Sequence, residues 1–154
     1  MGRFPKTTEM EYTRRRNLNR GFMKLNVWND AIDLYALVGE ILRGMGSLDL
    51  RLKSQILDAA QSVSANIAEG YGRKSINEYL YFLNVSLGSL SELMTRMIGL
   101  RRTDTLTQAS FEDFDECHYK VENRLIALIG SLQDKRRTGT WKSEFHEPTH
   151  PLAR

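Results

Sequence analysis

The positions of proline constrain the fold of this chain more than any other feature. The three prolines are Pro5, Pro148 and Pro151, so residues 6–147 contain none. Because proline interrupts the interior of a helix, such a long proline-free stretch favours long helices. The 154 residues are enough for one domain with a real core, and 41% hydrophobic with 27% charged residues is typical of a soluble globular protein.

Apolar residues recur every three or four positions in four segments, which is the spacing of one helix face. The pattern predicts helices over residues 25–43, 49–69, 76–102 and 108–137. Short turns and spacing close to 3.5 residues predict an all-α fold, an up-down-up-down antiparallel four-helix bundle. We therefore divide the chain into a basic N-terminal arm (1–22), the bundle (23–137) and a C-terminal tail (138–154).

The turn between the second and third predicted helices has its own sequence motif. Gly70 and Gly72 interrupt the apolar pattern, and glycine tolerates the positive φ that often ends a helix. Ser75 and Glu78 have the spacing of a capping box. A phosphate-binding loop is the alternative for Gly70-x-Gly72, but such a loop follows a strand, and a helix is predicted here. The residues assigned to this structural motif are Asn66, Glu69, Gly70, Gly72, Ser75 and Glu78. Hydrogen bonds across the hinge or between subunits are expected for the first two.

The third predicted helix carries two adjacent stripes of mostly apolar and small residues. Packing within one bundle buries only one such stripe. The second stripe is Tyr79, Phe82, Ser86, Ser89, Leu93 and Leu100. This excess predicts a subunit interface, and a central helix with a wide core face is the alternative. Gly88 costs helix stability, which a close helix crossing near Ser86 and Ser89 would offset.

The charge is distributed unevenly along the chain. Residues 1–26 carry +5, residues 27–134 carry −5 and residues 135–154 carry +3. Basic ends on a mildly acidic body are typical of proteins that bind nucleic acid, and solvated arms are the alternative. For residues 135–137, complementing the helix dipole is a further alternative. The candidate nucleic-acid-binding residues are Arg14, Arg15, Arg16, Arg20, Arg73, Lys74, Arg101, Arg102, Lys135, Arg136 and Arg137.

No pattern in the sequence indicates catalysis, a metal site or a cofactor. His146 to His150 formally matches HExxH, but Pro148 inside it prevents the helix that would bring both histidines together. Cys117 and His118 are adjacent on a helix and point in different directions, so His118 is expected to be a hydrogen-bonded core or interface residue. The single cysteine and the lack of a long apolar run predict a cytoplasmic protein without a membrane span.

Several strings in the chain resemble a known family. They include Leu25-x-x-Trp28-x-x-Ala31-x-x-Leu34, residues 64–73 (SANIAEGYGR), Ser75-x-x-Glu78-Tyr79-x-x-Phe82-Leu83 and Gly88-Ser89-x-x-Glu92-Leu93. They are similar to motifs of the four helix bundle protein family, small proteins encoded within intervening sequences of bacterial large-subunit rRNA genes. The resemblance covers about residues 20–135, with departures at Ala65 and Met94–Thr95.

The resemblance implies a ring-shaped homo-oligomer, a pentamer, without enzymatic activity. A relative in this fold, the accessory variability protein of diversity-generating retroelements, binds template RNA and a reverse transcriptase. Together with the basic ends, this predicts an oligomeric RNA-binding protein. The alternative is a protein–protein adaptor, such as the accessory subunit of a reverse transcriptase, with an acidic face for a basic partner. That face would comprise Asp30, Asp33, Glu112, Asp113 and Glu116.

Overall fold

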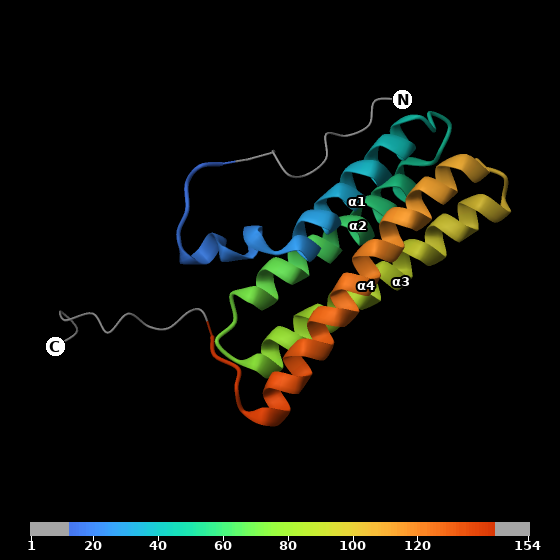
Figure 1. The fold of residues 1–154 in the computed structure, drawn as a ribbon. Coiled ribbons are helices and arrows are strands. Elements are labelled where there is room, and N and C mark those ends of the chain that lie inside the picture. The colour runs from blue at the N-terminus through green and yellow to red at the C-terminus, as the bar shows by residue number, and fades with distance from the viewer. Residues whose placement is uncertain (1–12, 144–154) are drawn as a thin grey trace.

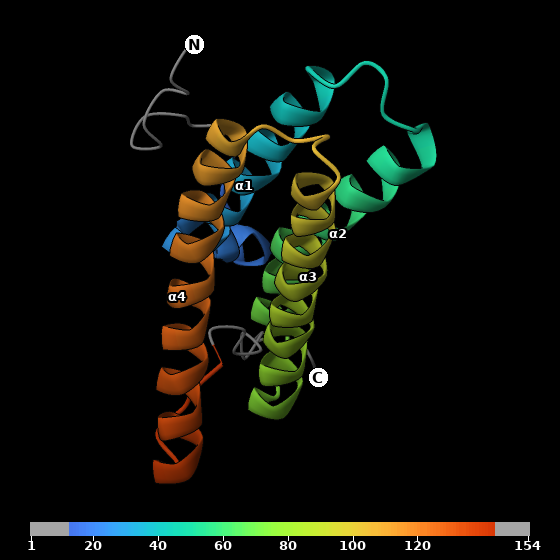
Figure 2. The same ribbon diagram turned by 90° about the vertical axis from the view of Figure 1, so that its right-hand side faces the viewer.

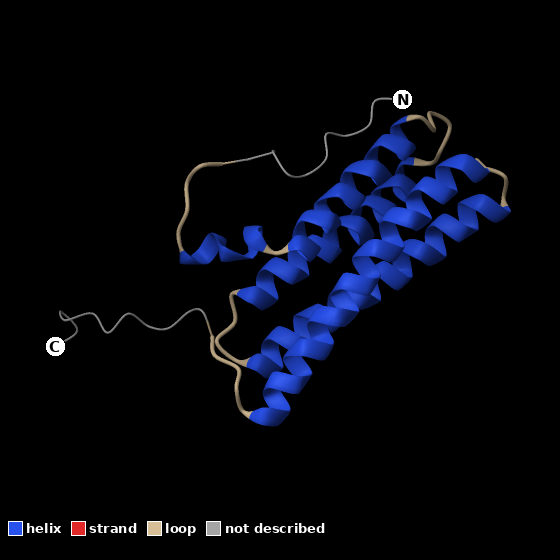
Figure 3. Cartoon of the chain, viewed as in Figure 1, coloured by secondary structure: helices blue, strands red, loops and turns tan. Residues whose placement is uncertain are grey.

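The computed structural model describes residues 13–143 of the chain, and this part contains helices and no β-strand (Figures 1 and 3). The elements are a 3₁₀ helix η1 (Leu18–Lys24) and four α-helices, α1 (Asn26–Arg43), α2 (Leu50–Tyr71), α3 (Ile76–Arg102) and α4 (Gln108–Thr138). Each α-helix begins and ends within two residues of its predicted bounds. The all-α prediction is confirmed. We refer to α1–α4 together as the helical body.

Local side-chain caps explain where three of the helices begin. The side chains of Asn17, Asp49 and Thr107 accept hydrogen bonds from backbone N–H groups three residues later. These bonds satisfy donors that have no partner within the first helical turn. Short polar residues in the connecting segments therefore set the starts of η1, α2 and α4.

Polar contacts fix the register of neighbouring helices. Between α2 and α3, the Ser86 hydroxyl donates to the Val63 carbonyl at 2.9 Å, and the Ser89 hydroxyl donates to the Ser62 hydroxyl at 2.8 Å. Between α3 and α4, the His118 Nε2 lies 2.8 Å from the Leu90 carbonyl oxygen. Arg136 of α4 also donates to the Asn77 side chain of α3. In both pairs residue numbers rise on one helix as they fall on the other, so the two helices run antiparallel.

The four α-helices surround one core. Each helix packs on the next along the chain, and α1 also packs on α4 (Figures 1 and 2). Leu34, Ile56, Leu83 and Phe114, one from each helix, are completely excluded from solvent. Burying side chains of this size contributes about 1.5–3 kcal/mol each, so packing of these apolar side chains drives folding.

The second stripe of α3 is buried within the protomer, and the inference of a subunit interface from it is wrong. Ser86 and Leu93 are completely buried, and the Ser86 and Ser89 hydroxyls bond to α2. Ser62 and Gly70 of α2 are small and lie against α3, so the two helices approach closely enough to bury both stripes. The alternative interpretation, a central helix with a wide core face, describes the structure.

The close crossing expected near Ser86 and Ser89 forms with α2, but Gly88 takes no part in it. A Cβ built at Gly88 meets no atom within 4 Å, so this glycine lies on the open side of α3. The glycine that lies at a close approach of the two helices is Gly70. A Cβ there would lie 2.9 Å from Tyr79 Cδ2 and 3.0 Å from Phe82 Cβ. Gly70 therefore serves helix packing.

The turn between α2 and α3 differs from the prediction in three details. The helix continues through Gly70 to Tyr71, and its C-cap Gly72 has a right-handed φ of −75°. Ser75 is the N-cap of α3 but makes no side-chain capping hydrogen bond, so the predicted capping box does not form. Asn66 donates to the carbonyl and hydroxyl of Ser62 on its own helix and not across the hinge. The short turn therefore forms without a left-handed glycine, without a capping box and without a hydrogen bond from Asn66 across the hinge.

Part of the predicted N-terminal arm is folded. The boundary placed between residues 22 and 23 falls inside η1, which contacts α1 and α2. Phe22 packs edge-on against Trp28, with ring centroids 5.2 Å apart. The periodicity of an α-helix could not show this segment because a 3₁₀ helix has three residues per turn.

Candidate nucleic-acid interface

Three segments that are distant in sequence meet at one end of the helical body. They are η1 with its flanks (13–25), the α2–α3 turn (69–79), and the end of α4 with the residues that follow it (132–143). A Cβ at Gly21 would lie 2.7 Å from the Tyr71 hydroxyl oxygen, so η1 rests on the end of α2. Arg136 donates to the Asn77 side-chain oxygen at 3.1 Å, joining α4 to α3. Figure 1 shows the chain after α4 running beside the α2–α3 turn. We call this region the basic end.

The two ends of the helical body differ in charge. The three segments of the basic end contain eleven Lys/Arg and three Asp/Glu. The segments at the opposite end, residues 40–53 and 99–112, contain five Lys/Arg and four Asp/Glu. A concentration of positive charge at one end produces a local field that attracts polyanions. The fold therefore gathers most of the positive charge of the described residues at the basic end.

Arg73 and Lys74 occupy the turn as predicted. The Arg73 guanidinium forms an ion pair with Glu69 and lies 4.7 Å from the centroid of the Phe82 ring. The Glu69 pairing within one helical turn is a further correction to the bonds expected across the hinge. Lys74 is exposed. One cation of the pair is thus held against α3, and the other extends from the tip of the turn.

The arginines before η1 lie on the surface of the same end. Arg14, Arg15 and Arg16 are exposed. The Arg20 guanidinium donates to the Arg15 carbonyl at 3.2 Å and to the Thr13 hydroxyl at 3.3 Å, which folds the segment back on η1. Of the predicted arginines in this arm, Arg20 is half-buried, and Arg16, although exposed, also donates to the Thr13 and Arg15 carbonyls.

The C-terminal end of α4 turns back on itself through Gly139. This residue has a φ of 67°, and its N–H donates to the Arg136 carbonyl at 3.3 Å. The Thr140 N–H donates to the Lys135 carbonyl at 3.0 Å, which completes a Schellman motif. Glycine suits this left-handed position because it has no Cβ. The reversal returns Trp141, two residues after Gly139, to the helical body, where it is half-buried.

A pocket of about 370 Å³ opens at the basic end under this reversal. The Tyr71 and Tyr79 rings meet edge to face there, with centroids 6.2 Å apart, and Lys24 Nζ lies 5.7 Å from the centroid of Tyr71. The pocket is lined by Leu25, Tyr71, Tyr79, Leu128, Leu132, Lys135, Thr140, Trp141 and Lys142. Of these, sequence analysis had singled out only Lys135 as a binding residue. Gly139 followed closely by a tryptophan was the available signal for a chain reversal.

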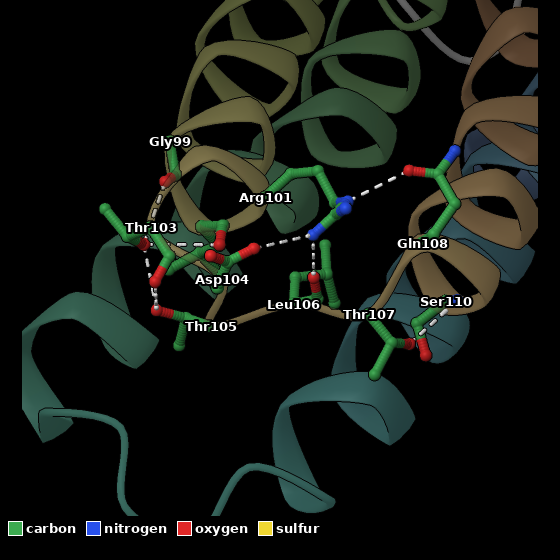
Figure 4. A network of polar contacts seen from close by, with 10 residues as sticks. Gly99, Arg101, Thr103, Asp104, Thr105, Leu106, Thr107, Gln108 and Ser110 are labelled. Carbon is green, nitrogen blue, oxygen red and sulfur yellow. Dashed lines mark hydrogen bonds and ion pairs between the residues drawn. The ribbon is translucent and has the colours of Figure 1, made fainter.

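Arg101 and Arg102 lie at the opposite end and do not join the other predicted cations. Arg101 Nε donates to the Gln108 side-chain oxygen at 3.0 Å, and Nη1 donates to the Leu106 carbonyl at 3.0 Å (Figure 4). Its guanidinium also lies 3.5 Å from an Asp104 carboxylate oxygen. Arg101 therefore organises the α3–α4 turn, and Arg102 is an exposed neighbour.

The acidic face expected for a protein partner is incomplete. Asp30 is only 4% exposed, and its carboxylate pairs with Lys120 at 3.3 Å and with Arg124 across the α1–α4 contact. A buried, paired carboxylate cannot contact a partner, so its place in that face is wrong. Glu112, Asp113 and Glu116 at the start of α4 are exposed.

The remaining reactive side chains are buried or engaged. Burial, followed by the nearby Asp33 carboxylate, raises the pKa of Cys117 to about 11 and so keeps its thiol protonated near neutral pH. His118 is a core residue bonded to the Leu90 carbonyl, as predicted. Within residues 13–143, no three His, Cys, Asp or Glu side chains are grouped to hold a metal ion. The HExxH match lies outside the described residues.

None of the helices in the described part of the chain has the length and apolar character to cross a membrane.

The comparisons with known proteins agree with the family resemblance. A crystal structure of a protein of unknown function from the S23 ribosomal protein family of Bacteroides thetaiotaomicron VPI-5482 matches with a TM-score of 0.64 and 21% identity. The match covers 67% of this chain and 97% of that one, and at this identity it shows the fold alone. A sequence comparison with curated proteins gave no match. The model of the 23S rRNA-intervening sequence protein family matches residues 23–127, well over half of the chain. The chain therefore belongs to the 23S rRNA-intervening sequence protein family.

Proposed function

We propose that this protein is a non-enzymatic, cytoplasmic RNA-binding protein that contacts RNA phosphates with its basic end. The observation that supports the proposal is the meeting of three basic segments at one end of the helical body. Each Lys or Arg that neutralises a phosphate releases counterions from the RNA. This release favours binding and does not depend on the RNA sequence. The choice of RNA rests on the rRNA intervening-sequence family to which the chain belongs.

We further propose that the protomer acts as an antiparallel four-helix bundle and assembles into a ring, a homopentamer. A ring would repeat the basic end around its axis, and weak phosphate contacts would then add up through avidity. With the second stripe of α3 buried inside the protomer, support for self-association comes from the outer surface of α4. Tyr119 and Ile126 are 62% and 52% exposed and lie seven residues apart on one face.

The test measures binding of a fluorescein-labelled structured RNA by anisotropy at two salt concentrations. The test variant replaces one exposed cation of each basic segment by neutral glutamine, with Arg15→Gln, Lys74→Gln and Arg137→Gln. The control variant makes the same charge change at the opposite end, with exposed Arg43→Gln, Arg51→Gln and Arg102→Gln. We expect the test variant to bind more weakly and to lower the salt slope by up to about 2–3, since each lost phosphate contact removes roughly 0.7–0.9.

The control variant should keep most of the affinity of the parent. Equal losses in both variants would contradict an interface at the basic end. If the parent protein does not bind RNA even at low salt, the RNA proposal fails. The exposed acidic residues at the start of α4 would then direct the search to a basic protein partner, such as a reverse transcriptase.

A further inference from the structure

We infer that the pocket at the basic end binds one unpaired nucleobase of the RNA, stacked on Trp141. This inference rests on the proposed RNA-binding function and adds the form of RNA that is recognised. The protein would bind single-stranded or bulged RNA in preference to a continuous duplex. The argument depends on the chemistry of the pocket lining, on its position among the cations and on how firmly its aromatic residues are held.

The pocket has the size and lining of a site for a small flat group. Its volume of about 370 Å³ lies near the lower end of the ~300–1,000 Å³ that small-molecule sites occupy. Leu25, Leu128 and Leu132 supply apolar surface, and Tyr71, Tyr79 and Trp141 supply aromatic rings. A nucleobase has two apolar faces and polar edges. It can therefore bury its faces among these side chains while its edges reach the hydroxyl-bearing residues and solvent.

Cations surround the aromatic residues. Lys135 and Lys142 line the same pocket, and exposed Arg137 is two residues from Lys135 on the last turn of α4. Aromatic side chains that stack bases, set among cations that neutralise the adjoining phosphates, are the usual composition of single-stranded nucleic-acid sites. An apolar peptide side chain would use the rings but not the cations, so the charge favours a nucleotide.

The aromatic residues are held in place before any ligand binds. Gly139 and the two Schellman hydrogen bonds fix the chain reversal that carries Trp141. Tyr79 is buried in α3 and meets Tyr71 edge to face. A site with fixed walls loses little conformational entropy on binding. Bases inside a duplex are already stacked and paired, so an unpaired base is the one that can enter.

Trp141 itself provides the signal for the test. The chain has two tryptophans, and Trp28→Phe leaves Trp141 as the only one. In that background, fluorescence is measured during titration with a short single-stranded oligoadenylate and, separately, with an abasic strand of equal length and charge. We expect the oligoadenylate to quench the fluorescence and to bind more tightly than the abasic strand, because only the former has bases to stack.

Affinity in the variants is measured by anisotropy with both strands labelled. Trp141→Ala should weaken oligoadenylate binding roughly 5- to 150-fold, the range reported by alanine substitution at base-stacking positions. It should leave binding of the abasic strand unchanged, which also shows that the variant is folded. Trp141→Tyr should restore most of the affinity. The matched control is Tyr81→Ala, which removes an exposed aromatic residue of α3 that does not line the pocket.

Two results would overturn the inference. If both strands bind equally and Trp141 fluorescence does not change, the basic end binds phosphates without a base pocket, and the proposed function stands. If neither strand binds, and the structured RNA also fails to bind at low salt, the inference and the proposed function fail together.

Discussion

At the scale of single residues, Gly70 decides how closely α2 and α3 can approach. Replacing it by alanine would add a Cβ within 3.2 Å of the Tyr79 backbone oxygen as well as against the Tyr79 and Phe82 side chains. Overpacking costs about 1–3 kcal/mol, while alanine gains up to ~1 kcal/mol of helix propensity. We expect Gly70→Ala to lower the free energy of unfolding by about 1 kcal/mol net, measured by urea denaturation.

Gly88→Ala is the matched control for that change. It makes the same substitution inside a helix at a position where the added methyl meets no atom of the described chain. Stability should rise by about 0.5–1 kcal/mol through helix propensity alone. A loss of stability at position 88 similar to that at position 70 would show that helix packing is not what distinguishes the two glycines.

The ion pairs of Asp30 give a second prediction at the residue scale. Lys120 and Arg124 are 53% and 44% exposed, so solvent can hydrate them when the carboxylate is removed. We expect Asp30→Asn to cost about 1–2 kcal/mol in urea denaturation. The double change Lys120→Ala and Arg124→Ala leaves a buried carboxylate without its cations and should cost more, about 3–5 kcal/mol. The reverse order would contradict the buried position of Asp30.

At the scale of an element, the α3–α4 turn depends on one side chain. Arg101 joins the end of α3 to the Leu106 carbonyl and to Gln108 at the start of α4, and the Thr103 hydroxyl caps α3 through the Gly99 carbonyl at 3.0 Å (Figure 4). We expect Arg101→Ala to lower the free energy of unfolding by about 1–3 kcal/mol through the lost charge-assisted hydrogen bonds.

The neighbouring Arg102→Ala is the control, because this exposed side chain carries the same charge. Its effect on unfolding should stay within ~0.5 kcal/mol. Both variants should retain the RNA affinity of the parent in the anisotropy experiment. A large loss of RNA binding from either substitution would place a second RNA contact at the end opposite the basic end.

At the scale of the whole molecule, the outer face of α4 tests the proposed assembly. Ile126 is half-exposed on a face that also presents Tyr119, and a ring would bury such a surface between protomers. We expect Ile126→Glu to lower the molar mass found by size-exclusion chromatography with light scattering while the helical circular dichroism is retained. An unchanged mass above that of the protomer would exclude this face from the interface, and a parent that is monomeric would overturn the ring.

Charge along the helical body is the second property of the whole molecule. Eleven cations and three acids gather at one end although they come from three separate parts of the chain. Along the sequence these residues belong to a basic N-terminal segment, a turn with no net charge and a basic C-terminal segment. The antiparallel helices place the second connection and the two flanks of the bundle at the same end, which turns a sequence asymmetry into a spatial one.

The sequence by itself determined the helices and most of the core. A long proline-free stretch with apolar residues every three or four positions buries its side chains as amphipathic helices, and the bounds of α1–α4 agree with that pattern. Val38, Leu83 and Phe114 are buried where the spacing placed them. Family motifs in the sequence likewise identified the family.

Only the tertiary structure decided which surfaces and cations work together. The periodicity of α3 indicates that two of its stripes can be buried. It does not indicate that α2 covers the second stripe. It cannot distinguish Arg101, whose partners lie in the α3–α4 turn and at the start of α4, from Arg73, whose ring partner is on the next helix. Trp141 joins Tyr71 and Tyr79 because a left-handed Gly139 reverses the chain. These are contacts between residues distant in sequence, and their distances follow from helix packing and not from local propensity.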